Sequence, residues 1–298
     1  MAGQSEPTSS TGTTLMLRAT PAVFVLLWST GYIGSKLGAP YAEPFTFLLL
    51  RFVAVVLILV VAVAALGKKW PNRTGALHAM VVGVLVHGGY LGGVFWAIHR
   101  GMPAGISALI VGLQPIATAI VAGRMLGEPV TIRHWLGLGI GLLGIGLVVA
   151  PKLGVAGEGI NGATIAAVIA AMFSMTIGTI YQKRFATGTP FLSGIVLQYV
   201  GAFFFVGAAA LLTEHFEVEW TGQFVFALSW LVLVLSIGAI SLLMVMISRG
   251  AVSRVAALLY LVPAVTALIA WGLFGETLTA VQLAGMALTV IAVALAGK

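Results

Sequence analysis

Few side chains of this sequence could exchange hydrogen bonds or charge inside an apolar environment, and most of these are aromatic or neutral polar. Seven are the candidates for contact with a substrate: Trp28, Ser29, Tyr32, His87, Tyr90, Gln114 and Tyr260. Hydroxyl, amide and imidazole groups bind the ends of a small zwitterion, and aromatic rings hold an apolar side chain. The set therefore predicts a binding site for a small uncharged or zwitterionic metabolite.

Two prolines, Pro115 and Pro263, are predicted to break apolar helices beside this site or to gate it. Proline donates no backbone hydrogen bond, so each leaves a carbonyl one turn earlier, that of Val111 or Leu259, for substrate or water. The alternative is a kinked helix that serves packing alone. Because the two prolines occupy matching positions in the two halves of the sequence, we favour a role at the substrate site.

Two ionisable side chains lie deep in predicted membrane spans. His87 shares a helix face with Tyr90. Because burying an ionisable ring at this depth is costly, we predict that His87 lines a cavity rather than forming a hydrogen bond to a carbonyl of a neighbouring helix. Arg51 is the only cation deep in a span. It lies eight residues from the span's start at 43, where its side chain can snorkel or pair with helix-end carbonyls, so we favour a structural role over a pathway role.

Enzymatic chemistry has little support in the sequence. There is no Cys and no Asp, so we predict no catalytic set, no metal site and no cofactor. A G-x-G-x-x-G match at 139–144 falls inside an apolar helix, where close helix packing by Gly137 and Gly141 is favoured over nucleotide binding. The acidic segment 214–219 is interpreted as a solvated loop rather than a cation site.

The composition is that of a membrane protein. Hydrophobic residues make up 60% of the 298 residues and charged ones 8%, with a mean hydropathy of +1.11. After a Ser/Thr/Gly-rich tail at 1–17, predicted to be disordered, ten apolar segments approach the length of about 20 residues that crosses a bilayer. They are 20–38, 43–66, 75–99, 103–125, 131–150, 160–184, 190–213, 220–247, 253–274 and 279–297.

Charge predicts the orientation of these spans. If both termini are cytoplasmic, eleven of the 15 Lys and Arg residues fall inside, three fall outside (Lys36, Arg100 and Lys152), and Arg51 lies within a span. The net charge of +7 is therefore interpreted as cytoplasmic loop charge, and no nucleic-acid partner is predicted.

The chain repeats itself. Pro115, Thr118, Glu128 and Thr131 correspond to Pro263, Thr266, Glu276 and Thr279, each pair 148 residues apart (263 − 115 = 148). We therefore divide the spans into a first repeat at 18–150 and a second at 151–298. Five spans per repeat is an odd number, so the second repeat is inverted, a build found in many secondary transporters.

Ten spans in two copies, each ending in a Pro-bearing helix, a Gly-Glu turn and a small-residue helix, resemble the drug/metabolite transporter superfamily. The EamA-type branch, with its bacterial exporters of amino acids including aromatic ones, is the most similar. This resemblance implies export by alternating access from the cytoplasm across a bacterial inner membrane, through a site between the earlier spans of each half. It also implies that segments 131–150 and 279–297 are peripheral.

Other functions stay open at this stage. The chain could be an intramembrane enzyme or an assembly factor, or the same fold carrying a drug or a nucleotide sugar. A channel is disfavoured because no ring of charged or filter residues occurs. Beyond the substrate and the lipid bilayer, no obligatory protein partner is evident.

The predicted span interiors contain no carboxylate, the common proton relay of coupled carriers. This favours either facilitated export or coupling through His87, because free histidine titrates near neutral pH. With few cations near mid-depth, the sequence favours neutral, fairly apolar amino acids over phosphorylated metabolites.

The repeat and the charge pattern together place the turn at Glu276 outside the cell. The chain has no native Cys, so a single cysteine introduced beside residue 276 can be labelled without background. We expect an impermeant maleimide to label it from the external side of intact cells. Labelling from the cytoplasmic side alone would contradict the inverted repeat.

Overall fold

The computed structural model describes residues 11–126, 130–150, 159–239, 242, 261–276 and 278–296. Its elements are α1 (Thr11–Gly38), α2 (Pro44–Ala65), α3 (Arg73–Gly83), the π-helix η1 (Val84–Gly89), α4 (Tyr90–His99), α5 (Ala104–Val111), α6 (Gln114–Leu126), α7 (Ile132–Val149), α8 (Gly162–Phe185), α9 (Phe191–Thr213), α10 (Gly222–Ser229), the π-helix η3 (Trp230–Ala239), α13 (Val262–Phe274) and α14 (Ala280–Ala296). Within the described residues, extended pairing is limited to one bridge between Ala42 and Val218.

Seven helical stretches of these residues are long and apolar enough to cross a membrane: 44–65, 73–99, 104–123, 132–149, 162–185, 191–213 and 222–239. They match the second to eighth predicted spans, and the apolar helices α13 and α14 are shorter. An all-α polytopic membrane fold is therefore confirmed. The count of ten spans and the inversion of the repeats remain predictions.

The first helix is longer than the sequence suggested. α1 begins at Thr11, so residues 11–17 of the expected tail are helical, and residues 1–10 lie outside the described residues. The physical reason is that propagating a formed helix adds one hydrogen bond per ordered residue, whereas starting one is costly.

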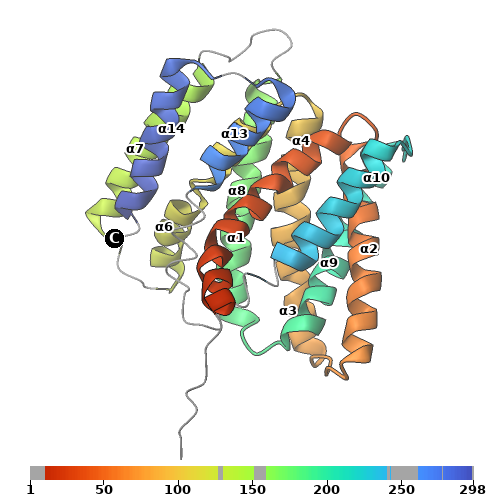
Figure 1. The fold of residues 1–298 in the computed structure, drawn as a ribbon. Helices are drawn as coiled ribbons and strands as arrows, with labels where there is room; N and C mark the ends of the chain where they lie inside the picture. The colour runs from red at the N-terminus through yellow and green to blue at the C-terminus, as the bar shows by residue number, and fades with distance from the viewer. Residues whose placement is uncertain are drawn as a thin grey trace, which may run out of the picture.

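The helices form a main bundle with a pair of helices at its edge. Figure 1 shows α7 and α14 side by side at one edge, while α2, α9 and α10 lie at the other. A Cβ atom on Gly144 would meet Thr289 and the backbone of Gly285, so these two helices approach closely. Gly141 packs against Leu113, whereas Gly139 faces open space. The glycine motif of α7 thus serves helix packing.

The third span changes its hydrogen-bond pattern midway. Residues 84–89 form the π-helix η1 between α3 and α4. Just before it, Gly83 lies against the backbone carbonyl of Gln198 in α9, and Gly201 lies against that of Met80. These contacts fix α3 and η1 directly on α9. Short π-helical segments within α-helices occur frequently at functional sites.

The acidic loop after α9 holds the start of α2. The Glu214 carboxylate accepts hydrogen bonds from the backbone N–H groups of Phe45 and Thr46, both at 2.7 Å, and from the Thr46 hydroxyl at 2.8 Å. In return, Glu43 accepts two backbone N–H groups from the loop 215–217. Negative charge at a helix N-terminus is favourable. Glu214 therefore acts as a helix cap.

The close contact between α3 and α9 predicts that alanine substitutions at Gly83 and Gly139 differ in their effect on stability. Gly83→Ala adds a methyl group against the backbone of Gln198, which cannot move away as a side chain would. We expect a loss of about 1–3 kcal/mol in the free energy of unfolding. The measurement is thermal unfolding of the detergent-solubilised protein.

Gly139→Ala is the matched control, because it adds the same methyl group to a helix where no atom lies within 4 Å. Its stability should be unchanged or slightly raised. Equal losses in the two variants would show that the α3–α9 contact is not tight.

Candidate functional site

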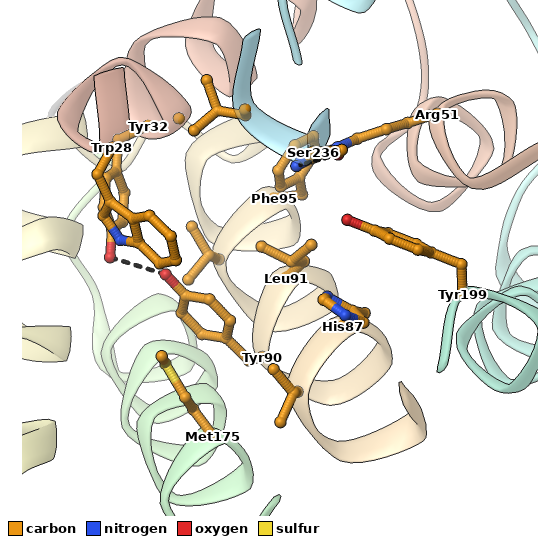
Figure 2. Close-up of a pocket in the computed structure, with 14 residues that line it drawn as sticks. Trp28, Tyr32, Arg51, His87, Tyr90, Leu91, Phe95, Met175, Tyr199 and Ser236 are labelled. Atoms are coloured by element: carbon orange, nitrogen blue, oxygen red, sulfur yellow. Dashed lines mark hydrogen bonds between the residues drawn. The ribbon is translucent and has the colours of Figure 1, made fainter. Parts of the chain in front are cut away.

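A cavity of about 110 Å³ lies inside the main bundle, with room for several water molecules or part of a small metabolite. Seven elements contribute to its wall: α1, α2, η1, α4, α8, α9 and η3. Its lining residues are Trp28, Gly31, Tyr32, Arg51, Val86, His87, Tyr90, Leu91, Val94, Phe95, Met175, Tyr199, Leu235 and Ser236. Both halves of the chain therefore form it. Figure 2 shows these side chains around the cavity.

A smaller cavity of about 40 Å³ adjoins the first one. The two share Trp28, Tyr32, Tyr90 and Met175 in their walls. The smaller cavity adds Gln114 and the two prolines singled out in the sequence, Pro115 and Pro263. Seven residues predicted from the sequence to contact substrate or to break helices thus lie around two adjoining cavities: Trp28, Tyr32, His87, Tyr90, Gln114, Pro115 and Pro263.

One other predicted residue that the structure describes, Ser29, lines neither cavity. Ser29 is fully buried, and its hydroxyl donates to the carbonyl of Val25 at 2.7 Å. Its own carbonyl accepts from the Thr266 hydroxyl at 3.3 Å, so Ser29 joins α1 to α13. The i−4 bond satisfies the hydroxyl within the helix and turns it away from the cavity. Tyr260 and Leu259 lie outside the described residues.

The two prolines start helices rather than kink them. Pro115 is the second residue of α6, after a break at 112–113, and Pro263 is the second residue of α13. Proline is favoured in a first helical turn because its missing N–H has no helical partner there. Gly112, which follows the last residue of α5, lies directly against the ring of Pro263, so α13 begins beside the break at 112–113 and the smaller cavity.

The aromatic side chains of the cavity contact one another in defined pairs. The hydroxyls of Tyr32 and Tyr90 lie 3.1 Å apart and join α1 to α4, as the dashed line in Figure 2 shows. His87 stacks on Tyr199 with ring centroids 4.4 Å apart and planes 11° from parallel. Stacking on a second ring holds the imidazole of His87 in place at the cavity wall.

Sequence reasoning missed part of this wall. Arg51, for which a structural role was favoured, is only 6% exposed and lines the cavity instead of snorkelling to the membrane surface. Its Nε and one terminal nitrogen donate to the Ser236 hydroxyl at 3.2 and 3.0 Å. Its rarity as a cation within a span was the available signal. Tyr199 and Met175 carried no signal, because nothing local distinguishes them from packing residues.

A second polar group lies where α1 ends and α5 begins. Glu276 forms an ion pair with Lys36 and also accepts the backbone N–H of Ala104 at 3.2 Å. The Lys36 nitrogen lies 4.7 Å from the centre of the Phe274 ring. This junction of Lys36, Glu276 and Ala104 connects the two halves of the chain. The corresponding acid of the first half, Glu128, lies outside the described residues.

Comparisons with known proteins identify a transporter family and several transporter relatives. The model of the EamA-like transporter family matches residues 20–150 and again residues 162–297. Among curated relatives, the uncharacterized inner membrane transporter YedA of Escherichia coli K12 is 26% identical over 278 residues, covering 92% of this chain and 89% of that protein. The uncharacterized transporter YvbV of Bacillus subtilis is 26% identical over 279 residues, with the same coverages.

Two further proteins are similar over most of their length. A probable amino-acid metabolite efflux pump of Salmonella typhimurium is 25% identical over 275 residues, covering 89% of each chain. A solved crystal structure shares the fold, with a TM-score of 0.64 at 21% identity and 97% coverage of both chains. The fold and the transporter relatives thus extend over nearly the whole sequence.

Glu276 is bonded both to Lys36 and to the backbone N–H of Ala104, whereas Lys36 is paired only with Glu276 in this junction. Removing either charge should therefore have unequal effects on stability. Glu276→Gln should lower the free energy of unfolding by about 1–2 kcal/mol, because it weakens both the ion pair and the bond to the Ala104 N–H. Lys36→Gln keeps the bond between Glu276 and the Ala104 N–H and should lower the free energy of unfolding by less, about 0–1 kcal/mol. Thermal unfolding in detergent compares them, and a larger loss from Lys36→Gln would contradict the double role of Glu276.

Proposed function

Since the chain belongs to the EamA-like transporter family, we propose that it exports small uncharged or zwitterionic metabolites, foremost neutral or aromatic amino acids. Its relatives are transporters rather than enzymes. The observation that carries the substrate class is the aromatic cavity, whose wall combines phenol, hydroxyl, imidazole and guanidinium groups with apolar side chains. The printed name of the Salmonella relative, an amino-acid metabolite efflux pump, supports the same class.

The mechanism we propose is alternating access between two inverted five-helix repeats. The wall of the cavity supports it, because α1, α2, η1 and α4 come from the first half and α8, α9 and η3 from the second. Relative movement of the halves would therefore open and close the same site. The junction of Lys36, Glu276 and Ala104 also connects the halves and would have to separate on one side. In this proposal ten spans cross a bacterial inner membrane and both termini are cytoplasmic.

A different cargo, such as a drug or a nucleotide sugar, is the second candidate. A nucleotide sugar carries a diphosphate, whose two charges need several cationic partners in a dry site. Arg51 is the one Lys or Arg residue that lines the cavity within the described part of the chain. This count favours a substrate with at most one negative charge.

The test is transport in proteoliposomes, measured as counterflow and efflux of labelled phenylalanine. Tyr90→Ala removes a ring shared by both cavities and should lower transport about tenfold or more. Tyr90→Phe loses only the 3.1 Å bond to Tyr32 and should lower it about fivefold, in line with roughly 1 kcal/mol for one hydrogen bond. Gln114→Ala should also weaken export while the protein stays in the membrane.

Phe204→Ala is the matched control, since it truncates an aromatic ring that is 63% exposed on the outer face of α9. Its transport should equal that of the unchanged protein. Robust counterflow of a sugar phosphate or nucleotide sugar, without competition from amino acids, would overturn the assignment.

A further inference from the structure

Arg51 brings a positive charge into the cavity without a matching negative one. None of the fourteen lining residues is acidic, and within the described residues Arg51 forms no ion pair. Its nearest polar partner is the neutral hydroxyl of Ser236. A buried charge that lacks an opposite charge is destabilising, because the surrounding protein replaces only part of its hydration.

The Arg51 guanidinium also has more N–H groups than it has hydrogen-bond acceptors within the described residues. It carries five N–H groups in a planar fork, yet its two hydrogen bonds within the described residues both reach one oxygen atom, Ser236 Oγ. A carboxylate fits such a fork with two parallel bonds, each stronger than a bond to a neutral hydroxyl. The geometry and the charge of this end of the cavity therefore suit a monovalent oxyanion.

The rest of the wall defines where the remainder of a ligand would lie. In Figure 2, Arg51 and Ser236 lie together on one side, and Trp28 lies with the Tyr32–Tyr90 pair on the opposite side. Leu91 and Phe95 lie between these two sides. A molecule bound to Arg51 thus extends over apolar and aromatic groups toward Trp28.

We propose that Arg51 is the residue that selects the substrate by its carboxylate, with Ser236 occupying the guanidinium until substrate replaces it. The proposal rests on the proposed export function and narrows it. The substrate class becomes monocarboxylates with an apolar or aromatic body, in which an α-amino group is tolerated but is not the main recognition element. Among the described residues that line the cavity, none is acidic and able to pair with an ammonium group.

The experiment compares three molecules with the same aromatic body: phenylalanine, 3-phenylpropionate, which lacks the amine, and phenethylamine, which lacks the carboxylate. Each is tested as a stabiliser of the purified protein in thermal-shift titrations and as a competitor of labelled phenylalanine in counterflow. Both carboxylates should bind, and phenethylamine should bind at least about tenfold more weakly, as expected for the loss of a hydrogen-bonded charged partner.

Variants then assign the selectivity to Arg51. Arg51→Gln should weaken carboxylate binding roughly 10- to 100-fold and leave phenethylamine nearly unchanged, so that the preference disappears. Arg51→Lys keeps the charge without the fork and should fall between the two. Ser236→Ala keeps the guanidinium and should retain the carboxylate preference. If Arg51→Gln keeps the full preference, the proposal is wrong.

The unchanged protein decides the matter even if Arg51→Gln does not fold. Equal binding of phenethylamine and 3-phenylpropionate, or no binding of any carboxylate, overturns the role of Arg51. Export of phenylalanine together with such equal binding would leave the proposed function standing and remove only this inference. Binding of 3-phenylpropionate without any amino-acid transport would support Arg51 and overturn the amino-acid assignment instead.

Discussion

Backbone hydrogen bonding in a bilayer constrains this structure more than any single side chain does. Lipid offers no partners for N–H and C=O groups, so a spanning segment stays helical except where protein or a wet cavity covers the irregular part. The described spans depart from α-helix at the break 112–113 and in the π-helices η1 and η3. These departures supply Gly112 to the smaller cavity and His87 and Ser236 to the larger one. The irregular backbone thus coincides with the candidate site.

The membrane-spanning helices could be predicted from the sequence because they follow from the length of its apolar segments. Seven of the predicted spans recur as helical stretches long enough to cross a membrane, because about 20 apolar residues can form few other structures there. The local backbone conformation within each span could not be predicted. Nothing in residues 73–99 indicates that the middle turns are π-helical, since this depends on the fit of Gly83 and Gly201 between α3 and α9. Pro115 follows a helix break at 112–113, but the first-turn position of both prolines was not predicted.

The candidate site was predictable where a residue type is rare in a membrane helix. His87, Tyr90 and Gln114 stood out on that ground, and the structure places all three at the cavities. Ser29 did not join them because a hydroxyl can bond the carbonyl four residues earlier in its own helix. The direction of the Arg51 side chain could not be predicted for a related reason. Position along a span gives depth, whereas the direction of a side chain depends on the neighbouring helix, here η3 with Ser236.

The wall of the larger cavity is chemically lopsided although the chain is duplicated. The first half supplies Trp28, Tyr32, Arg51, His87 and Tyr90 to this wall, whereas the second half supplies Met175, Tyr199, Leu235 and Ser236. The family model matches both halves, yet the two halves contribute unlike side chains to one cavity. If Arg51 binds a carboxylate as proposed, a ligand with one charged end and one aromatic end has a single preferred orientation in this cavity. Molecules with two identical ends gain nothing from that polarity.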